Sequence, residues 1–325
     1  MATRKKQTRR KGKTAGGVSL FALLIVLALF LLDRQGIVDF QSMFPVPAAN
    51  PSVVSADGER LEVIYFDVGQ GDSELLRIPK GDGSYHHLLI DSGESGYAEG
   101  LISSLEDMGV KTLDTVVVTH PHSDHMGGMA SILRHFTVGA LYMPETAEQD
   151  TPTTRVYEDL LDAVEERSIP LHRLEEGGSL GLPDTVKVRI FSPEAGRAYG
   201  ELNNYSGVIR IAYGNTSFLF TGDAEALVEK EILDKGYQPG TDVLHLGHHG
   251  SSTSSTEDFL RAVSPDFAVI SCGKDNKYGH PHKEVLDRLN ALGCTVYRTD
   301  ENGTIAAYSD GNTVAFETGA RTITP

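Results

Sequence analysis

Cysteine is scarce in this sequence. The 325 residues include two, Cys272 and Cys294, and these do not form a Cys-x-x-Cys pair. A zinc site built from thiolates is therefore not expected. Outside the cytoplasm the two residues could form a disulfide, and two separate buried thiols are the alternative.

Several catalytic motifs are also absent. No P-loop and no Ser-His-Asp arrangement is apparent, and Gly69-x-Gly71 is too short for a dinucleotide-binding fingerprint. The sequence therefore gives no indication of a phosphate-cradling loop, a dinucleotide cofactor or a serine nucleophile.

Positive charge is scarce outside the N-terminus. Residues 1–34 carry eight Lys or Arg and one Asp, a net charge of +7. The formal net charge of the whole sequence is −16, so the remaining residues carry −23. An acidic body repels phosphate backbones at long range. This argues against tight duplex-DNA binding, while cleavage of a small phosphodiester or metal-assisted cleavage of a nucleic acid stays compatible with it.

The N-terminal region has the pattern of a membrane anchor. Residues 1–15 form a basic tail, and residues 16–32 are an uncharged, Leu-rich run that would make a helix of about 25 Å, enough to span a thin bilayer. The positive charges predict a cytoplasmic tail, a single-pass transmembrane anchor and an extracytoplasmic body. A cleaved signal peptide, giving a secreted protein, is the alternative, but no small-x-small site follows Leu32. Residues 33–58, with several prolines, read as a linker.

A single globular domain is expected over residues 59–320. Apolar strand-like segments alternate with helical patterns and short turns, which favours an α/β fold of two sheets sandwiched between helices, a four-layer αββα body. Strands are predicted at 61–67, 73–78, 87–91, 116–119, 186–191, 208–213, 217–221, 242–246 and 267–271, with three more near the end. Helices are predicted at 98–108, 127–136, 155–167, 224–235, 256–263 and 283–292.

One cluster of potential metal ligands follows a predicted strand. The β-branched run 116–119 ends in four candidates within six residues, namely His120, His122, Asp124 and His125. Imidazole and carboxylate groups together suit zinc, manganese or iron. A lone histidine would more often be a core or surface residue, but packing does not explain four candidates at this spacing.

Two further candidate groups also follow predicted strands. Asp223 ends the run Phe-Leu-Phe-Thr-Gly-Asp, and His248 and His249 lie in Gly-His-His-Gly-Ser. Alone, Asp223 could be a helix N-cap and His-His-Gly is a weak signal. With the first cluster they complete two metal sites, and the Asp223 carboxylate could bridge them.

These motifs resemble those of the metallo-β-lactamase-fold hydrolases, and in particular the extracytoplasmic domain of the ComEC competence proteins and their stand-alone relatives. The resemblance covers about residues 60–318 and lacks the multi-pass channel, so it implies the hydrolase domain and not DNA uptake. The motifs that carry it are Phe66-Asp-Val-Gly-Gln-Gly-Asp-Ser73, Leu89-Ile-Asp-Ser-Gly93, Thr119-His-Pro-His-Ser-Asp-His125, Asn203-Asn-Tyr-Ser206, Phe220-Thr-Gly-Asp223, His248-His-Gly-Ser251 and Tyr278-Gly-His-Pro281.

The resemblance implies two divalent metal ions, zinc in the first place and manganese in the second. His120 and His122 would hold one ion, Asp124, His125 and His248 the other, and Asp223 would bridge them. No further histidine occurs near Asn203, so the first ion would be weakly held. Asn203 and Ser206 would line the site.

Other residues are expected to support this site. Supporting or substrate-contacting positions are expected for Asp67, Asp72, Asp91, His249 and Ser251, with turn capping as the alternative for the three aspartates. Asp124 would also orient a catalytic hydroxide, and His280 would contact the scissile phosphate or the leaving group.

The leading functional hypothesis is a phosphodiesterase or nuclease outside the cytoplasmic membrane, with single-stranded DNA among the candidate substrates. Hydrolysis of an amide or ester, including β-lactams, is the alternative within the same fold. A non-catalytic surface binding protein is the third hypothesis.

Overall fold

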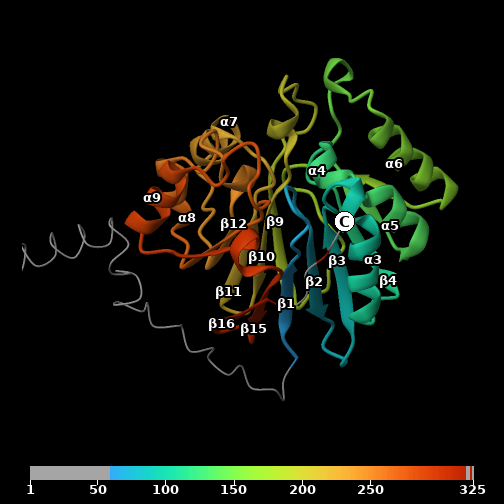
Figure 1. Ribbon diagram of the computed structural model, residues 1–325, viewed down its shortest axis with the longest axis horizontal. Helices are drawn as coiled ribbons and strands as arrows, with labels where there is room; N and C mark the ends of the chain where they lie inside the picture. Colours follow the sequence, from blue (N-terminus) through green and yellow to red (C-terminus); the bar gives the residue numbers. More distant parts are fainter. Residues whose placement is uncertain (1–58, 320–322, 324–325) are drawn as a thin grey trace, which may run out of the picture. The chain divides into compact units, whose positions relative to one another are not determined.

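The computed structural model describes residues 59–319 and residue 323. Two large sheets dominate this part of the chain (Figure 1). The first sheet has eight strands in the order β16-β15-β1-β2-β3-β5-β7-β8. These are β1 (Leu61–Tyr65), β2 (Glu74–Pro79), β3 (Tyr85–Ile90), β5 (Thr115–Val117), β7 (Leu141–Met143), β8 (Leu171–Arg173), β15 (Ile305–Ser309) and β16 (Val314–Thr318).

The second sheet has six strands in the order β14-β13-β12-β11-β10-β9. They are β9 (Val186–Ser192), β10 (Val208–Tyr213), β11 (Thr216–Phe220), β12 (Val243–His245), β13 (Phe267–Ile270) and β14 (Thr295–Arg298). Strands β11 to β14 run parallel, as do β3, β5, β7 and β8 of the first sheet. Parallel strands end at the same edge of a sheet, so residues that follow them are brought together there. A small third sheet pairs β4 (Thr112–Leu113) with β6 (Thr137–Val138).

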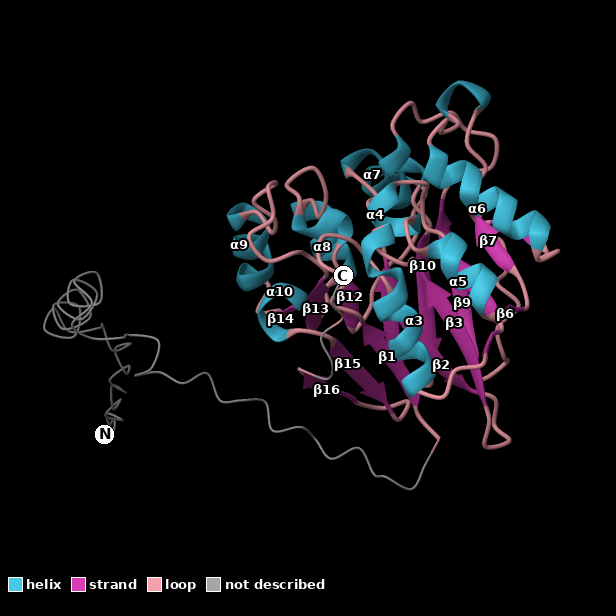
Figure 2. Ribbon diagram, turned by 45° about the vertical axis from the view of Figure 1, so that its right-hand side comes forward, coloured by secondary structure: helices cyan, strands magenta, loops and turns pink. Residues whose placement is uncertain are grey.

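Helices cover the outer face of each large sheet, as Figure 2 shows. One side carries α3 (Ala98–Asp107), α5 (Met129–His135) and α6 (Arg155–Glu166), and the other carries α7 (Ala226–Asp234), α8 (Glu257–Val263) and α9 (Lys283–Ala291). The shorter helices are α4 (Ser123–Met126) and α10 (Thr299–Asn302), and 3₁₀ turns lie at Ser95–Tyr97, Glu148–Asp150, Leu202–Tyr205 and Gly247–Gly250. The predicted four-layer αββα sandwich is thus confirmed.

The layers follow from the alternation of side chains along each strand. In β1, Leu61, Val63 and Tyr65 pack into the core between the sheets, whereas Ile64 packs under α3 and α5. Likewise Leu219 of β11 faces the helices α7 and α8, away from the core between the sheets. Because both faces of these strands are buried, they read as continuous apolar runs.

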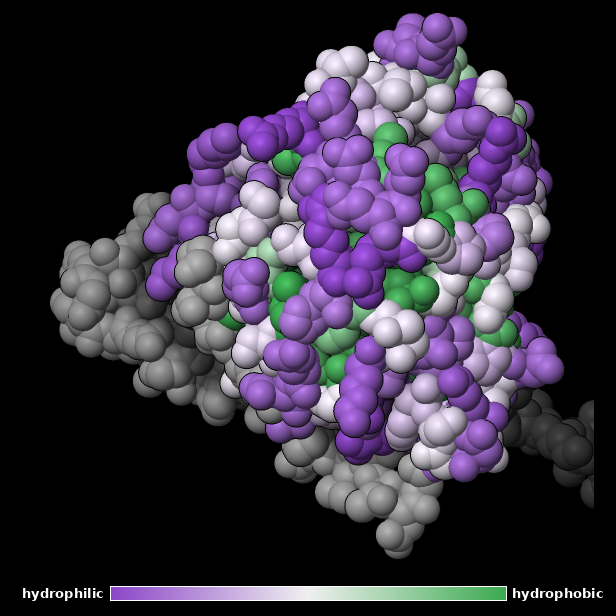
Figure 3. All heavy atoms as spheres, turned by 90° about the vertical axis from the view of Figure 1, so that its right-hand side faces the viewer, coloured by the Kyte–Doolittle hydropathy of each residue, from purple (hydrophilic) through white to green (hydrophobic). Residues whose placement is uncertain are grey.

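The outer helices are amphipathic. In α3, Leu101 and Leu105 are fully buried, and the helix ends where Gly109 adopts a φ of 79°, the left-handed conformation that glycine allows. In α6, Leu160 and Ala163 are buried while acidic side chains face outward. Figure 3, which looks onto the side of α3, α5 and α6, shows mainly hydrophilic residues with smaller hydrophobic patches between them.

The strands β7 and β8 were not predicted, because each has only three residues and no clear alternation. The basic tail (1–15), the transmembrane anchor (16–32) and the linker (33–58) lie outside the described residues. Within the described part of the chain, no helix is long and apolar enough to cross a membrane. Cys272 and Cys294 are two free, buried thiols, and burial raises the pKa of each to about 12.

Candidate metal centre

The predicted ligand residues meet at one edge of the two sheets. His120 and His122 follow β5, and Asp124 and His125 lie in α4 directly after them. Asp223 follows β11 of the other sheet, and the turn Gly247–Gly250 follows β12. Strands from both sheets thus deliver side chains to the same place.

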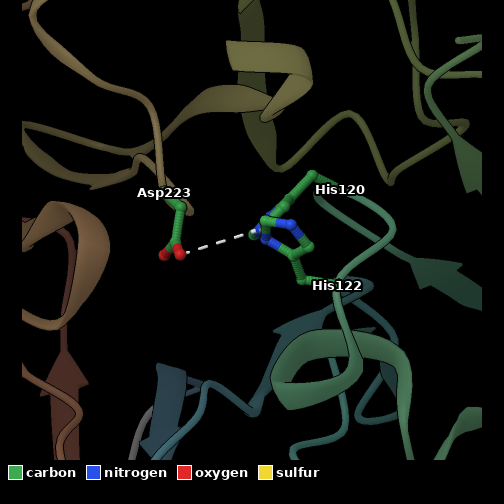
Figure 4. A group of neighbouring side chains, drawn as sticks. All are labelled: His120, His122 and Asp223. Atoms are coloured by element: carbon green, nitrogen blue, oxygen red, sulfur yellow. Dashed lines mark hydrogen bonds and ion pairs between the residues drawn. The ribbon is translucent and has the colours of Figure 1, made fainter. Parts of the chain in front are cut away.

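The first group consists of His120, His122 and Asp223, whose ligand atoms all lie within 4.8 Å of one another. His120 Nε2 lies 3.0 Å from His122 Nδ1 and 3.7 Å from Asp223 Oδ2. Figure 4 shows the carboxylate of Asp223 pointing toward the two imidazoles from the opposite side. His120 is fully buried, whereas His122 is partly exposed and lines a cavity.

The second group consists of Asp124, His125 and His249, again within 4.8 Å of one another. His249 Nε2 lies 3.4 Å from Asp124 Oδ2 and 3.7 Å from Asp223 Oδ1. His125 Nε2 lies 3.2 Å from that same Asp223 oxygen. The group is therefore joined to the first one through the two oxygens of Asp223.

The expected placement of His248 with Asp124 and His125 is corrected by this geometry, because His249 stands there instead. The cause is the backbone: His248 and His249 have φ values of 51° and 53°, two consecutive left-handed residues that reverse which ring faces inward. His249 is 2% exposed and His248 is 21% exposed. His248 Nε2 lies 3.7 Å from Asp223 Oδ2, on the side of the first group. Such strained conformations cluster at functional sites.

Buried carboxylates back the imidazoles of the second group. Asp91 Oδ2 lies 2.8 Å from His125 Nδ1, and Asp91 also accepts hydrogen bonds from the backbone N–H and the hydroxyl of Thr119. Asp72 Oδ1 lies 3.1 Å from His249 Nδ1, which is also 3.0 Å from the carbonyl oxygen of Ser271. A carboxylate on the far ring nitrogen fixes the orientation of an imidazole and increases its basicity. The structure thus places Asp72 and Asp91 beside these imidazoles, where the predicted supporting role is possible.

Three other supporting candidates occupy different places. Asp67 caps its own turn by accepting from the Gly69 N–H at 3.3 Å, and no imidazole contacts it among the described residues, so the turn-capping alternative holds. Ser206 Oγ accepts a hydrogen bond from the Asp223 N–H at 3.0 Å and so fixes that carboxylate. The Ser251 hydroxyl forms a hydrogen bond with the Thr253 hydroxyl just after the turn Gly247–Gly250, and Ser251 does not line the cavity.

The charges of the two groups differ. Burial, together with the neighbouring His125, lowers the pKa of His120 well below its usual value. Burial opposes the charged form of His125 too, but Asp223 and Asp91 raise its pKa well above the usual value. His249 behaves in the same way beside Asp223 and Asp72. The second group therefore has an excess of negative charge, which a bound cation would neutralise in place of protons.

The arrangement fits divalent metal ions. His125 Nε2, His249 Nε2 and Asp223 Oδ1 are buried atoms without a hydrogen-bond partner, and all three converge on one point. Buried polar atoms are rarely left unpaired unless an ion or a water satisfies them. Nitrogen and carboxylate donors suit zinc and manganese. His120, His122 and Asp223 would hold one ion, and Asp124, His125, His249 and Asp223 the other.

A cavity of about 280 Å³ opens onto these groups. Asn203 lines it, donating to Glu225 at 3.3 Å and leaving its own Oδ1 without a partner. His280 lies on the wall with its ring 5.6 Å from that of His248, and its Nδ1 has no partner. Burial and the nearby histidines His249 and His248 lower the pKa of His280 to about 4, so its ring is neutral at pH 7.

Sequence reasoning missed several residues of this region. Glu74 and His245 lie beneath the centre, fully buried, with His245 Nε2 3.3 Å from Glu74 Oε1 and 3.9 Å from Asp72 Oδ1. Their signal was a polar, titratable residue at the end of a mainly apolar strand. Gln70 and Tyr278 line the cavity, and their residue types gave no signal.

The fold and this site define the class of the protein. Residues 68–274 match the family model of the metallo-β-lactamase superfamily, and the chain belongs to that family.

Among curated proteins, the chain is similar to ComE operon protein 3 of Bacillus subtilis, with 31% identity over 88% of this chain and 38% of that protein. It is 34% identical to competence protein ComA of Neisseria gonorrhoeae over 75% of this chain and 31% of that one. Recombination protein 2 of Haemophilus influenzae is 30% identical over 75% of this chain and 28% of its own length. The chain thus spans about a third of the length of these relatives and is homologous to one domain of the competence proteins.

Solved structures are more distant. The CmlA β-hydroxylase E377D mutant has 16% identity and a TM-score of 0.47, over 87% of this chain and 59% of that chain. A diphosphatase from the PhnP family has 15% identity and a TM-score of 0.44, over 77% of this chain and 99% of that chain.

Proposed function

We propose that this protein is a metal-dependent phosphodiester hydrolase, a phosphodiesterase or nuclease, that acts outside the cytoplasmic membrane. The observation that carries the proposal is the pair of ligand groups sharing Asp223, with an open polar cavity on one side. Two divalent ions held there would supply hydroxide near neutral pH and neutralise the charge that develops on the phosphoryl oxygens.

The residues of the chain have separate tasks in this proposal. Asp124 lines the cavity, and burial opposes its ionisation while His249 and His125 lower its pKa, so its carboxylate is ionised and can orient the attacking hydroxide. His280 lines the cavity with a neutral ring and is the side chain assigned to contact a phosphoryl or leaving-group oxygen. Ser206 and Asp91 hold Asp223 and His125 in position.

The relatives support a phosphodiester substrate. Their names refer to competence and recombination, and the domain of this chain is homologous to part of each. Beyond residue 34 the net charge is −23, which disfavours the binding of long duplexes. Short or single-stranded substrates are favoured instead, and single-stranded DNA is the leading candidate. The predicted anchor at residues 16–32 would tether the protein to the membrane with its N-terminus in the cytoplasm.

The test uses the full chain, stripped of metal and reloaded with zinc or manganese. It should cleave bis(p-nitrophenyl) phosphate and a single-stranded oligonucleotide, and His120→Ala should abolish both activities. His172→Ala is the matched control, because this exposed histidine of β8 packs on Tyr142 of β7 and has no place in the metal centre. Turnover of nitrocefin without cleavage of any diester would replace the proposal by amide hydrolysis. Metal binding without any of these activities would favour a binding protein.

A further inference from the structure

A second hollow of about 410 Å³ lies next to the metal-centre cavity. The two share four wall residues: Gln70, Ser123, Asp124 and Tyr278. The outer hollow also reaches Lys277, which the inner one does not. A substrate whose phosphate lies at the metal centre would therefore place its neighbouring group in the outer hollow.

The loop that carries Tyr278 is held in a fixed shape by one side chain. Asn276 Oδ1 accepts hydrogen bonds from the backbone N–H groups of Tyr278 and His280, at 3.1 and 3.0 Å. Its Nδ2 donates to the carbonyl oxygens of Gly273 and His280, at 2.9 and 2.6 Å. A loop braced at four backbone groups can present a side chain to a ligand at little entropic cost.

Tyr278 is a large aromatic residue left in the open by this loop. It is 52% exposed, and its ring lies near-parallel to that of His280, with centroids 5.5 Å apart and planes 23° apart. The Lys277 ammonium group lies 4.9 Å from the centroid of the Tyr278 ring, and no carboxylate pairs with it among the described residues. The ammonium group lies over the ring, so a base that stacks there would displace it toward the flanking phosphate.

The other walls favour a base over a second phosphate in the outer hollow. Glu94 and Asp124 both line it, and their carboxylates would repel a phosphate. Gln70 lines both hollows, accepts from the Gly273 N–H through its Oε1 at 3.1 Å, and has its Nε2 buried. A flat, uncharged group such as a pyrimidine complements the Tyr278 ring and is not repelled by these carboxylates.

We propose that the outer hollow binds the nucleobase next to the scissile phosphate, stacked on Tyr278, with Lys277 contacting the flanking phosphate. This inference rests on the proposed phosphodiesterase function and names its substrate class, a nucleotide unit of a single strand. Tyr278 is then a specificity-determining residue.

The test compares two diesters with the same leaving group, the p-nitrophenyl ester of thymidine monophosphate and methyl p-nitrophenyl phosphate. The metal-loaded full chain should prefer the thymidine ester in kcat/KM. Tyr278→Ala should lower the ratio of the two kcat/KM values by about tenfold to a hundredfold, as expected for the loss of one stacked base. Tyr278→Phe should keep the ratio, because it retains the ring. Leu171→Ala, which removes a side chain of similar exposure at 45% from a separate hollow, should also keep it.

The outcomes separate the two proposals. If both diesters are cleaved and Tyr278→Ala leaves the ratio unchanged, the base subsite is wrong and the phosphodiesterase function stands. If wild-type protein with bound metal cleaves neither, the phosphodiesterase proposal fails, and binding of fluorescent oligothymidylate decides about the subsite. A Kd raised at least tenfold by Tyr278→Ala and not by Tyr278→Phe supports it, and equal Kd values overturn it.

Discussion

The two halves of the candidate metal centre are built differently. In the half with His125 and His249, each imidazole has a buried carboxylate on its far nitrogen, Asp91 at 2.8 Å and Asp72 at 3.1 Å. In the other half, hydroxyl groups take these places: Thr119 Oγ1 lies 3.2 Å from His120 Nδ1. A carboxylate strengthens and orients a metal-binding imidazole more than a hydroxyl does.

Exposure separates the halves in the same way. His122 and His248 are partly exposed at the open cavity, whereas both imidazoles of the other half, His125 and His249, are buried; His249 also lines the cavity, and His120 is fully buried. One half is therefore a fixed anchor, and the other is the side where a ligand can exchange. This gives a structural reason for the weakly held first ion that the sequence suggested, and it predicts that stepwise metal removal empties the His120 half first.

The largest effect is expected from the residue that both halves share. Asp223→Asn keeps the shape of the side chain but removes the negative charge between the two groups. The positive charge of bound ions or protonated imidazoles would then be buried without this compensating carboxylate, which is unfavourable. Hydrolysis should fall to background, and elemental analysis should find less than one ion per chain. Asp287→Asn, at an exposed helical carboxylate paired with Lys283, should change neither value. Full activity in Asp223→Asn would show that the halves are not joined through this residue.

The next largest effect is expected at Gly71, whose backbone packs against Asp124 of the half with His125 and His249. Gly71 has a φ of 152°, and a Cβ there would lie 2.3 Å from the carbonyl oxygen of Asp124. Gly71→Ala should lower the free energy of unfolding by roughly 1–3 kcal/mol through overpacking and shift Asp124. Gly81 also has a positive φ, of 84°, but its Cβ would meet no atom within 4 Å. Gly81→Ala should therefore cost about 1 kcal/mol from strain alone. Denaturant unfolding of both variants measures the difference, and equal losses would contradict the close packing.

Smaller effects are expected from the groups that contact the far nitrogen of an imidazole, a carboxylate in one half and a hydroxyl in the other. Asp72→Asn should weaken the tighter of the two metal-binding constants by about tenfold to a hundredfold. Thr253→Val removes the hydroxyl 3.1 Å from His248 Nδ1, a ring beside the first group that holds neither ion, and should weaken the other constant by about threefold at most. Competition with a chromophoric chelator gives both constants. If the two variants act on the same constant, the halves do not differ in the way proposed.

Much of the fold was predictable because its strands are buried on both faces and its helices are amphipathic. Val116, Leu219 and Leu101 lie in patterns that identify their elements from sequence alone. The short strands β7 and β8 escaped notice because three residues are too few to show a period. Their places are set by the pairing of β7 with β5 and of β8 with β7, long-range contacts that no local pattern records.

The site was predictable in membership more than in detail. His120, His122, Asp124, His125 and Asp223 meet as expected, because each follows a strand that ends at the same edge. His249, and not the predicted His248, lies with Asp124 and His125 because both histidines have left-handed backbone conformations. The sequence of two adjacent histidines does not show which ring faces the site. Asp67 and Asp72 lie in the same turn motif, yet only Asp72 reaches an imidazole.

Metal content of two single-histidine variants tests the central claim most directly. Full-length protein is loaded with zinc, dialysed, and analysed by plasma mass spectrometry. The account predicts two ions per chain for the wild type and for His248→Ala, and one for His249→Ala. Loss of an ion from His248→Ala with two retained in His249→Ala would contradict it, as would less than one ion per chain in the wild type.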